Sequence, residues 1–284
     1  KQLSIKEQLS KEQLYEDQTG NKWDRRHKLD IYKELKKNNN EITVSFHPKY
    51  FVNKNHSTIP FPLSGLSNSE TIHCNENGYY FIYNSDRFGF NNPDIEWEKD
   101  EIDYLLIGDS FAFGDCVNSP HDIASNLRNL SGKNVLNLSY SGNGPLIQYA
   151  TLKEFLPKKV KKILWIYNDG NDLENLEDEL KNKILLNYLN EEKFTQSLKK
   201  KQVLSDKIGK KIIDSEIEQK INFPMLKFLK IYHTRALILT PKKAPLGEFK
   251  KIMKLSKKLS ENNNIELYFI YLPSFEVINS KNLQ

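Results

Sequence analysis

Three loops hold the residues that could do chemistry, and each loop follows a short apolar run. The residues are Ser110, Gly142 and Asn171. A serine just past a buried strand, at the start of a helix, can present its hydroxyl to solvent on a rigid base. The helix N-terminus favours developing negative charge, glycine lets the backbone approach a ligand closely, and asparagine donates through its NH₂ without bringing a charge. These residue types suit a reaction in which an oxygen becomes negatively charged.

The spacing of the three loops indicates that they lie at one edge of a sheet. Gly142 follows Ser110 by 32 positions, and Asn171 follows Gly142 by 29. A strand-helix-strand unit occupies about 30 residues, so each loop comes one unit after the last. Ligands bind beyond the carboxyl ends of the strands in open parallel sheets. We therefore expect the three loops to point toward the same edge.

Apolar runs alternate with amphipathic stretches from residue 102 onward. The apolar runs are 104–107, 135–138, 163–167 and 265–271, and the stretches with apolar residues every three or four positions are 122–130, 146–156 and 249–259. A parallel sheet covered by helices on both faces requires this alternation. The pattern predicts an α/β fold, a three-layer α/β/α sandwich with a central parallel sheet.

Three further expectations concern stretches of this region. Residues 173–201 predict a long, exposed helical insertion. Residues 225–239 favour a helix, although 236–239 could also be a strand. The run 265–271 predicts a buried strand.

The first hundred residues differ in composition from the rest. Residues 1–40 are polar and predict a surface helix or a loosely ordered arm. Residues 41–100 are rich in aromatics, Asn, Ser and Pro, and they predict an extension of short strands and long loops packed on its neighbour. Residues 101–284 form the main domain. The chain starts with Lys1 and stops soon after 265–271, so we expect a fragment truncated at its C-terminus.

The strand ends resemble the sequence blocks of the SGNH/GDSL hydrolases. Gly-Asp-Ser at 108–110 resembles the first block, Asn137 followed five residues later by Gly142 resembles the second, and Gly-Asn-Asp at 170–172 resembles the third. A lone Gly-Asp-Ser recurs by chance, whereas three blocks in order at strand ends are a specific signal. The resemblance covers about 100–275 and implies the flavodoxin-like SGNH hydrolase fold.

The resemblance implies a role for each residue. Ser110 would be the nucleophile, and the oxyanion hole would be the backbone N–H groups of Ser110 and Gly142 with the side-chain amide of Asn171. Asp109 and Asp172 would be supporting residues. The implied activity is serine-dependent ester hydrolysis or O-acyl transfer through an acyl-enzyme, with no cofactor and no metal. Water or a sugar hydroxyl could receive the acyl group.

The segment 85–93 is similar to the lead-in before the serine block of some bacterial members. Those members suggest a periplasmic or cell-envelope protein whose substrate is an acylated carbohydrate or another small ester. They also allow membrane anchoring through a segment absent from this chain, in which no apolar run reaches the ~18 residues that span a bilayer.

The catalytic base of the family is missing from this sequence. The family takes its base and orienting acid from an Asp-x-x-His motif near the C-terminus, and no Asp-x-x-His follows the serine block in this sequence. Its histidines are predicted to be surface or packing residues; they are His27, His47, His56, His73, His121 and His233. Either the fragment stops before the motif, which we favour, or the protein is a catalytically inactive relative that binds carbohydrate or an envelope partner.

Each residue also has a plainer interpretation. Ser110 and Asn171 could be helix N-caps, and Gly142 could be a turn glycine, although these roles would have to coincide at three successive strand ends. A nucleotide or flavin binder, with 108–114 around a phosphate, is a third possible function. Neither a Walker lysine nor a dinucleotide glycine pattern supports it.

Composition argues against further classes of protein. The net charge of +5 comes mainly from scattered lysines, which indicate solvated surface and no nucleic-acid partner. The two cysteines, Cys74 and Cys116, do not form a metal-binding pattern. They are either a disulfide, which would imply an oxidising compartment, or two unpaired thiols.

Overall fold

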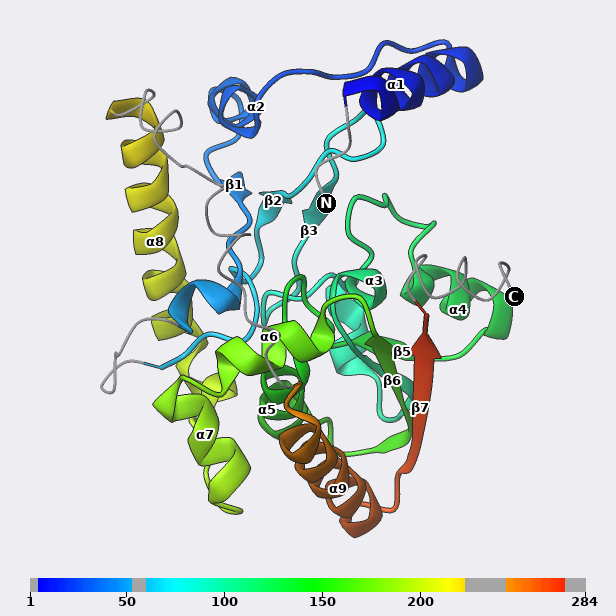
Figure 1. Ribbon diagram of the computed structural model, residues 1–284, viewed down its shortest axis with the longest axis vertical. Helices are drawn as coiled ribbons and strands as arrows, with labels where there is room; N and C mark the ends of the chain where they lie inside the picture. Colours follow the sequence, from blue (N-terminus) through cyan, green and yellow to red (C-terminus); the bar gives the residue numbers. More distant parts are fainter. Residues whose placement is uncertain (1–4, 53–59, 223–243, 274–284) are drawn as a thin grey trace.

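The structure is a computed structural model that describes residues 5–52, 60–222 and 244–273 (Figure 1). Within these residues the central sheet has the strand order β5-β4-β6-β7, and every neighbouring pair is parallel. The strands are β4 (Ile102–Ile107), β5 (Val135–Asn137), β6 (Val160–Asn168) and β7 (Glu266–Leu272). They match the four apolar runs of the sequence.

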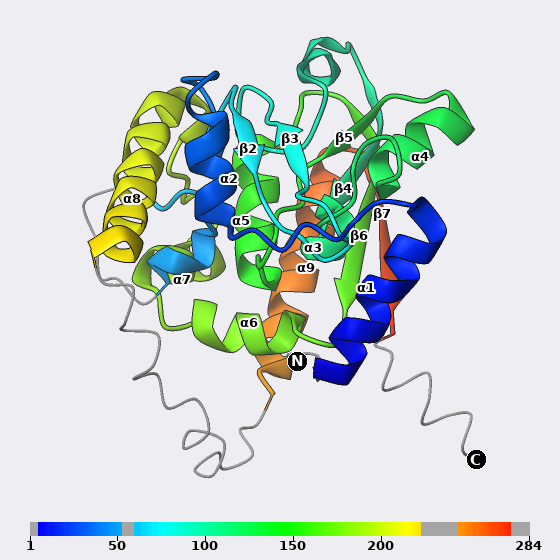
Figure 2. The same ribbon diagram turned by 90° about the horizontal axis from the view of Figure 1, so that it is seen from above.

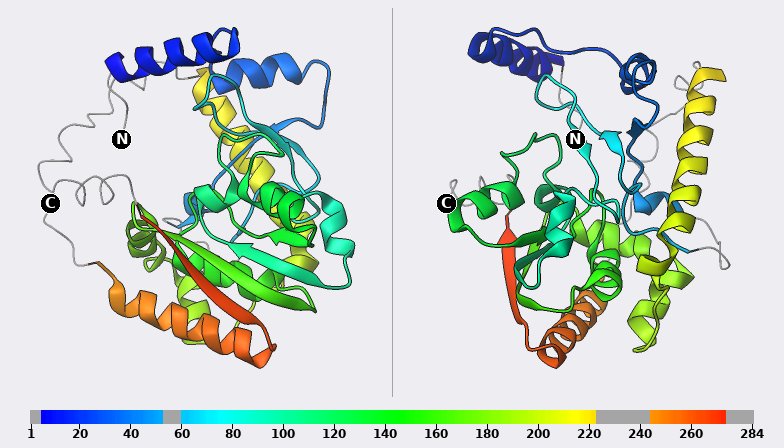
Figure 3. Two further views of the ribbon diagram at one scale, coloured as in Figure 1. Left: turned by 90° about the vertical axis from the view of Figure 1, so that its right-hand side faces the viewer. Right: turned by 180° about the vertical axis from the view of Figure 1, so that it is seen from behind.

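Helices cover both faces of this sheet, as Figure 3 shows. The covering helices are α3 (Ser110–Phe113), α4 (Ile123–Ser131), α5 (Pro145–Phe155) and α9 (Leu246–Asn262). Leu106 of β4 packs with Ala112 of α3 and Ala124 of α4 on one face. Its neighbour Leu105 belongs to the larger core on the other face, together with Ile252 of α9. Successive strand residues point to opposite faces, so two covered faces require uninterrupted apolar runs. The predicted α/β/α sandwich is confirmed.

The segment 173–201 is not the long exposed helix that its polarity predicted. It contains most of α6 (Asp172–Glu179), then α7 (Lys183–Asn190) and the 3-10 helix η3 (Leu198–Lys201), and α8 (Gln202–Asn222) follows. Asn182 separates α6 from α7, because its side chain accepts hydrogen bonds from the N–H groups of Ile184 and Leu185. Leu185 and Tyr188 are buried, and α7 packs against α5. The prediction of one exposed insertion was therefore wrong, and α8 was not foreseen.

Strand β7 was predicted to be buried, but it lies at the edge of the described sheet. It pairs with β6, and four of its side chains are between 37% and 50% exposed: Tyr268, Phe269, Ile270 and Tyr271. Their aromatic and branched character suits a strand at either a central or an edge position, so composition did not distinguish the two. The helix predicted over 225–239 lies outside the described residues.

The described part of the first hundred residues, 5–52 and 60–100, contains helices and a small second sheet (Figure 2). The elements are α1 (Ile5–Thr19), α2 (Lys28–Leu35), β1 (Thr43–Val44), η1 (Pro48–Phe51), β2 (Glu70–Ile72), β3 (Ile82–Asn84) and η2 (Asp94–Glu98). β2 lies between β1, to which it is parallel, and β3, to which it is antiparallel. The short strands agree with the prediction for 41–100, whereas the boundaries 1–40, 41–100 and 101–284 stay a prediction. No helix in the described ranges combines the length and apolar character needed to cross a membrane.

Asp86 organises the segment 85–93 and fastens it to the main sheet. Its fully buried carboxylate accepts hydrogen bonds from the N–H groups of Phe88 (2.9 Å) and Phe90 (3.0 Å), from Asn92 Nδ2 (2.9 Å) and from Trp97 Nε1 (2.7 Å). Asn92 in turn accepts a hydrogen bond from the N–H of Asn137 and donates one to its carbonyl, both at 2.8 Å. The segment therefore docks on β5, the strand that leads to Gly142.

We expect the substitution Asp86→Ala to destabilise the protein by at least about 3 kcal/mol, because it leaves several buried donors without an acceptor. Urea denaturation followed by circular dichroism measures this free energy. Asp94→Ala is the matched control in the same segment, since its carboxylate is exposed and pairs with Arg87 at the surface; its loss should stay within about 1 kcal/mol. Equal losses in the two variants would contradict a central role for Asp86.

Candidate active site

The three loops predicted to share an edge follow strands that are neighbours in the sheet. Ser110 follows β4, Gly142 follows β5 and Asn171 follows β6. Because β5-β4-β6 are parallel, their carboxyl ends lie at the same edge. The first two loops are also joined directly, because the N–H of Tyr140 donates to the carbonyl of Gly108 at 3.4 Å.

Ser110 is the first residue of α3 and does not cap it. Asp109 is the N-cap, because its carboxylate accepts a hydrogen bond from the N–H of Phe111 at 3.1 Å. The hydroxyl of Ser110 donates to the other carboxylate oxygen of Asp109 at 3.4 Å. Ser110 is half-buried, and the Phe111 side chain beside it is 57% exposed. The plainer interpretation of Ser110 as a helix cap is therefore wrong.

Asn171 lies at the N-cap position of α6, yet its side chain makes no capping hydrogen bond. It lies close enough to Asp109 to lower the pKa of that carboxyl group, and its own Oδ1 is buried without a partner among the described residues. Asp109 is fully buried, and burial raises the pKa of its carboxyl group, whereas the hydrogen bonds from Phe111, Asn171 and Ser110 oppose this shift. One carboxylate thus contacts both the Ser110 hydroxyl and the Asn171 amide.

Gly142 lies in the turn after β5 with a φ of +75°, a conformation that favours glycine. Within the described residues, neither its backbone N–H nor that of Ser110 donates a hydrogen bond to another group. Gly144, two residues later, is the N-cap of α5. Its N–H donates to the buried carboxylate of Glu179 at 2.6 Å, which fixes the end of this loop.

Asp172 stabilises the third loop through hydrogen bonds to the residues beside it. Its fully buried carboxyl group accepts hydrogen bonds from the N–H of Asn168 at 2.8 Å and from Gln148 Nε2 at 3.4 Å. Burial, followed by repulsion from Asp109, raises the pKa of Asp172 to about 8. The group holds the end of β6 to the start of α6, and so it fixes the backbone on either side of Asn171.

The raised pKa of Asp172 predicts that stability declines as the pH rises. The folded protein keeps this proton up to about pH 8, whereas the unfolded chain releases it near the ordinary value of 3.8. The folded state therefore binds more protons between these values, and the free energy of unfolding falls there by up to about 1.4 kcal/mol per pH unit. Urea titrations between pH 5 and 9 should show a weaker decline for Asp172→Asn than for the wild type; parallel declines would contradict the assignment.

Two histidines from the N-terminal segment lie beside the candidate site. Nε2 of His73 is 2.9 Å from one carboxylate oxygen of Asp115, and the hydroxyl of Ser141 donates to the other at 2.6 Å. The N–H of Asp115 donates to the carbonyl of Ser110 at 3.0 Å. His47 Nδ1 donates to the carbonyl of Ser141 at 3.0 Å. These contacts join the Ser110 and Gly142 loops to each other and to the segment 41–100.

Sequence reasoning missed this cluster, because it assigned every histidine to surface or packing roles. His73 is 2% exposed and does pack against Phe81 and Phe113, yet it also bonds Asp115. His47 is partly buried against the Gly142 loop. The one local signal for this cluster in the sequence was Asp115, which lies five positions after Ser110 in a polar loop. His121 is exposed, as predicted, whereas His56 and His233 lie outside the described residues.

The two cysteines form a disulfide. Cys74 and Cys116 are bonded, with their Cα atoms 5.3 Å apart. Cys74 follows His73, and Cys116 follows Asp115, so the covalent link and the His73–Asp115 contact lie side by side. The sequence left open either a disulfide or two unpaired thiols. The structure has the disulfide, which links the N-terminal segment to the chain just after α3.

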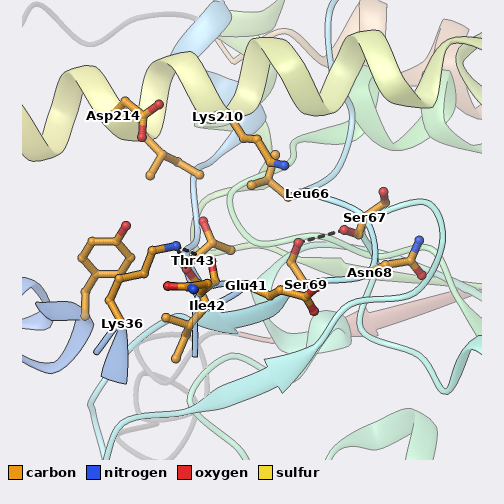
Figure 4. Close-up of a pocket in the computed structure, with 13 residues that line it drawn as sticks. Lys36, Glu41, Ile42, Thr43, Leu66, Ser67, Asn68, Ser69, Lys210 and Asp214 are labelled. Atoms are coloured by element: carbon orange, nitrogen blue, oxygen red, sulfur yellow. Dashed lines mark hydrogen bonds between the residues drawn. The ribbon is translucent and has the colours of Figure 1, made fainter. Parts of the chain in front are cut away.

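A separate polar hollow lies away from these loops, between α2, β1 and α8 (Figure 4). Its volume is about 380 Å³, and Lys36, Thr43, Ser67, Lys210 and Asp214 are among the residues that line it. None of the predicted site residues lies on its wall. Among the described residues, no three His, Cys, Asp or Glu side chains are grouped as a metal site would require.

Comparison with known proteins gives a weak structural likeness and no matching family. No protein-family model matches the chain, and no curated protein matches it. A solved structure of a mutant of the esterase AlinE4 is 14% identical, with a TM-score of 0.24, and the match covers 57% of this chain and 97% of that one. A TM-score this low does not bear on the chemistry of this chain, so the function has to be inferred from the site itself.

Proposed function

We propose that this protein is a serine-dependent ester hydrolase or O-acyltransferase of the SGNH/GDSL type. The observation that carries the proposal is the Asp109 carboxylate, which contacts both the Ser110 hydroxyl and the Asn171 side-chain amide. A nucleophile and an oxyanion donor from two different strand ends are thereby brought together. The three sequence blocks and the parallel order β5-β4-β6 support the same proposal.

In the proposed reaction, the Ser110 oxygen attacks the carbonyl carbon of an ester, and its proton passes to a general base. The carbonyl oxygen becomes an oxyanion, which three donors stabilise: the N–H groups of Ser110 and Gly142 and the NH₂ of Asn171. The C–O bond to the alcohol then breaks, the alcohol leaves with the proton that the base had taken, and an acyl-Ser110 remains. Water or a sugar hydroxyl attacks this intermediate, takes the acyl group and restores the serine.

Asp109 has a positioning role in this proposal. A carboxylate accepts hydrogen bonds and does not donate them, so it turns the NH₂ of Asn171, and not its oxygen, toward Ser110. That NH₂ has two hydrogens; one bonds Asp109, and the other remains for the oxyanion. The N–H groups of Ser110 and Gly142, which have no other described partner, are likewise available.

The general base is not assigned within the described residues, because no histidine there bonds the Ser110 hydroxyl. The family resemblance would supply it from an Asp-x-x-His motif. The same resemblance favours an acylated carbohydrate or another small ester as substrate. The Cys74–Cys116 disulfide supports a periplasmic or cell-envelope location, where disulfides persist.

Fluorophosphonate labelling of the full-length protein tests the proposal. We expect one covalent adduct, which peptide mass spectrometry places on Ser110. The absence of an adduct on Ser110, under conditions that label a known serine esterase, would count against acyl chemistry. The unassigned base favours a second candidate function, a catalytically inactive protein that binds carbohydrate. That function predicts no adduct but retention on an immobilised polysaccharide.

A further inference from the structure

His47 comes from the N-terminal segment, yet its ring lies against the loop that carries Gly142. Nδ1 donates to the carbonyl of Ser141 at 3.0 Å. A Cβ added at Gly142 would lie 3.5 Å from the same nitrogen, so the ring and the glycine backbone are nearly in contact. His47 immediately precedes η1, and its ring also packs against that of His73 at 5.6 Å between centroids. The imidazole is therefore part of the wall beside the proposed oxyanion donor.

The bond to Ser141 fixes which nitrogen of His47 carries the proton. A carbonyl oxygen accepts hydrogen bonds only, so Nδ1 must be the N–H donor, and Nε2 of the neutral ring is then an acceptor. Burial lowers the pKa of His47, which keeps the ring neutral near pH 7. Within the described residues, Nε2 has no hydrogen-bond partner, and the residue is partly exposed.

We propose that His47 contacts the substrate, with Nε2 accepting a hydrogen bond from a hydroxyl group of the bound ester. This inference rests on the proposed function and narrows its substrate class to esters of polyhydroxylated alcohols, such as partially acylated sugars. An acceptor on the wall of the site discriminates between substrates by chemistry, since an ester without a hydroxyl group makes no hydrogen bond to Nε2. The N-terminal segment would thus supply specificity to a nucleophile that the sheet supplies.

The test compares two variants of His47 on two esters. His47→Asn keeps an amide donor near the position of Nδ1 and removes the acceptor at Nε2. His47→Gln places an amide oxygen near Nε2 and loses the bond to Ser141. The esters are 6-O-acetylglucose, which has hydroxyl groups, and 4-nitrophenyl acetate, which has none. His121→Asn is the control, because His121 is exposed and contributes no described contact to the site.

The quantity to measure is the ratio of kcat/KM for the sugar ester to kcat/KM for the nitrophenyl ester, in the full-length protein. A shift of the Gly142 loop affects both esters and cancels in this ratio. We expect His47→Asn to lower the ratio about 3- to 10-fold, the loss of one hydrogen bond. His47→Gln and His121→Asn should keep the wild-type ratio. An unchanged ratio in His47→Asn, or an equal fall in both His47 variants, would overturn the inference.

The pH dependence of the same ratio gives a second readout. Protonation turns Nε2 into a donor, so its hydrogen bond to the substrate hydroxyl must reverse direction. We therefore expect the wild-type ratio to change as the pH drops through the lowered pKa of His47, whereas the ratio of His47→Gln should stay flat. His73, Lys28 and Asp115 also act on the charge of His47, and Lys49 lies on the same wall. A flat wild-type ratio would overturn the inference. Failure of the proposed function itself is distinct, since activity on both esters would then survive Ser110→Ala.

Discussion

Ser110→Ala is expected to lower kcat on an acyl ester by about a millionfold in the full-length protein. The Ser110 oxygen is the only protein atom that the proposed reaction uses to form its covalent intermediate, so no neighbouring group can replace it. The fold should tolerate the change. The lost hydrogen bond to Asp109 is long, at 3.4 Å, and Asp109 still caps α3 through the N–H of Phe111. The free energy of unfolding should therefore change by less than about 1 kcal/mol.

Ser119→Ala is the matched control for this experiment, because Ser119 is an exposed serine beyond the same helix. Its kcat and its labelling by the fluorophosphonate should equal those of the wild type. Residual activity in Ser110→Ala within about tenfold of the wild type would show that another group performs the chemistry. Loss of activity together with loss of the folded state would be recognised by circular dichroism, and Ser110→Cys would then replace alanine as the test.

Asn171→Ala is expected to lower kcat by about 100- to 1000-fold, the usual effect of removing one oxyanion donor. The loss should appear mainly in kcat, because the oxyanion exists only in the transition state. Asn171 does not cap α6, and its Oδ1 has no described partner, so alanine removes the contact with Asp109 but no helix cap. Steady-state kinetics with a nitrophenyl ester and urea denaturation measure the two effects separately.

Two further variants sharpen this prediction. Asn171→Asp should be at least as inactive as alanine, because a carboxylate lacks the donor and repels both the oxyanion and Asp109. Asn118→Ala, at an exposed asparagine on the loop after α3, should leave kcat unchanged. A rise in KM with an unchanged kcat in Asn171→Ala would instead assign Asn171 to ordinary substrate binding.

The sequence by itself determined the central sheet and the positions of its three loops. Apolar runs such as 104–107 predict strands wherever both faces of a sheet are covered, since each residue must be buried on one side or the other. The spacing of Ser110, Gly142 and Asn171 then follows from the length of a strand-helix-strand unit. These signals are local and periodic, and β4, β5 and β6 lie where they indicated.

Local sequence patterns were less informative about how far a helix or strand is exposed to solvent. The polar segment 173–201 predicted a surface helix, yet Asn182 divides it and Leu185 is buried. The apolar run 265–271 predicted a buried strand, yet β7 has one neighbour within the described sheet. Exposure depends on what packs against an element, and neighbours from elsewhere in the chain leave no periodic signal in the element itself.

Only the tertiary structure decided which groups surround Ser110 and Gly142. His47 and Ser141 are 94 positions apart, and His73 and Asp115 are 42 apart. A single histidine has no spacing to interpret, so the sequence could not distinguish one that packs in the core from one that bonds a loop. The shared contacts of Asp109 likewise depend on the distance between two strand ends, which is set by sheet packing. Residue types and their periodicity determined the central sheet, whereas contacts between distant parts of the chain determined which chemical groups lie at the edge of that sheet.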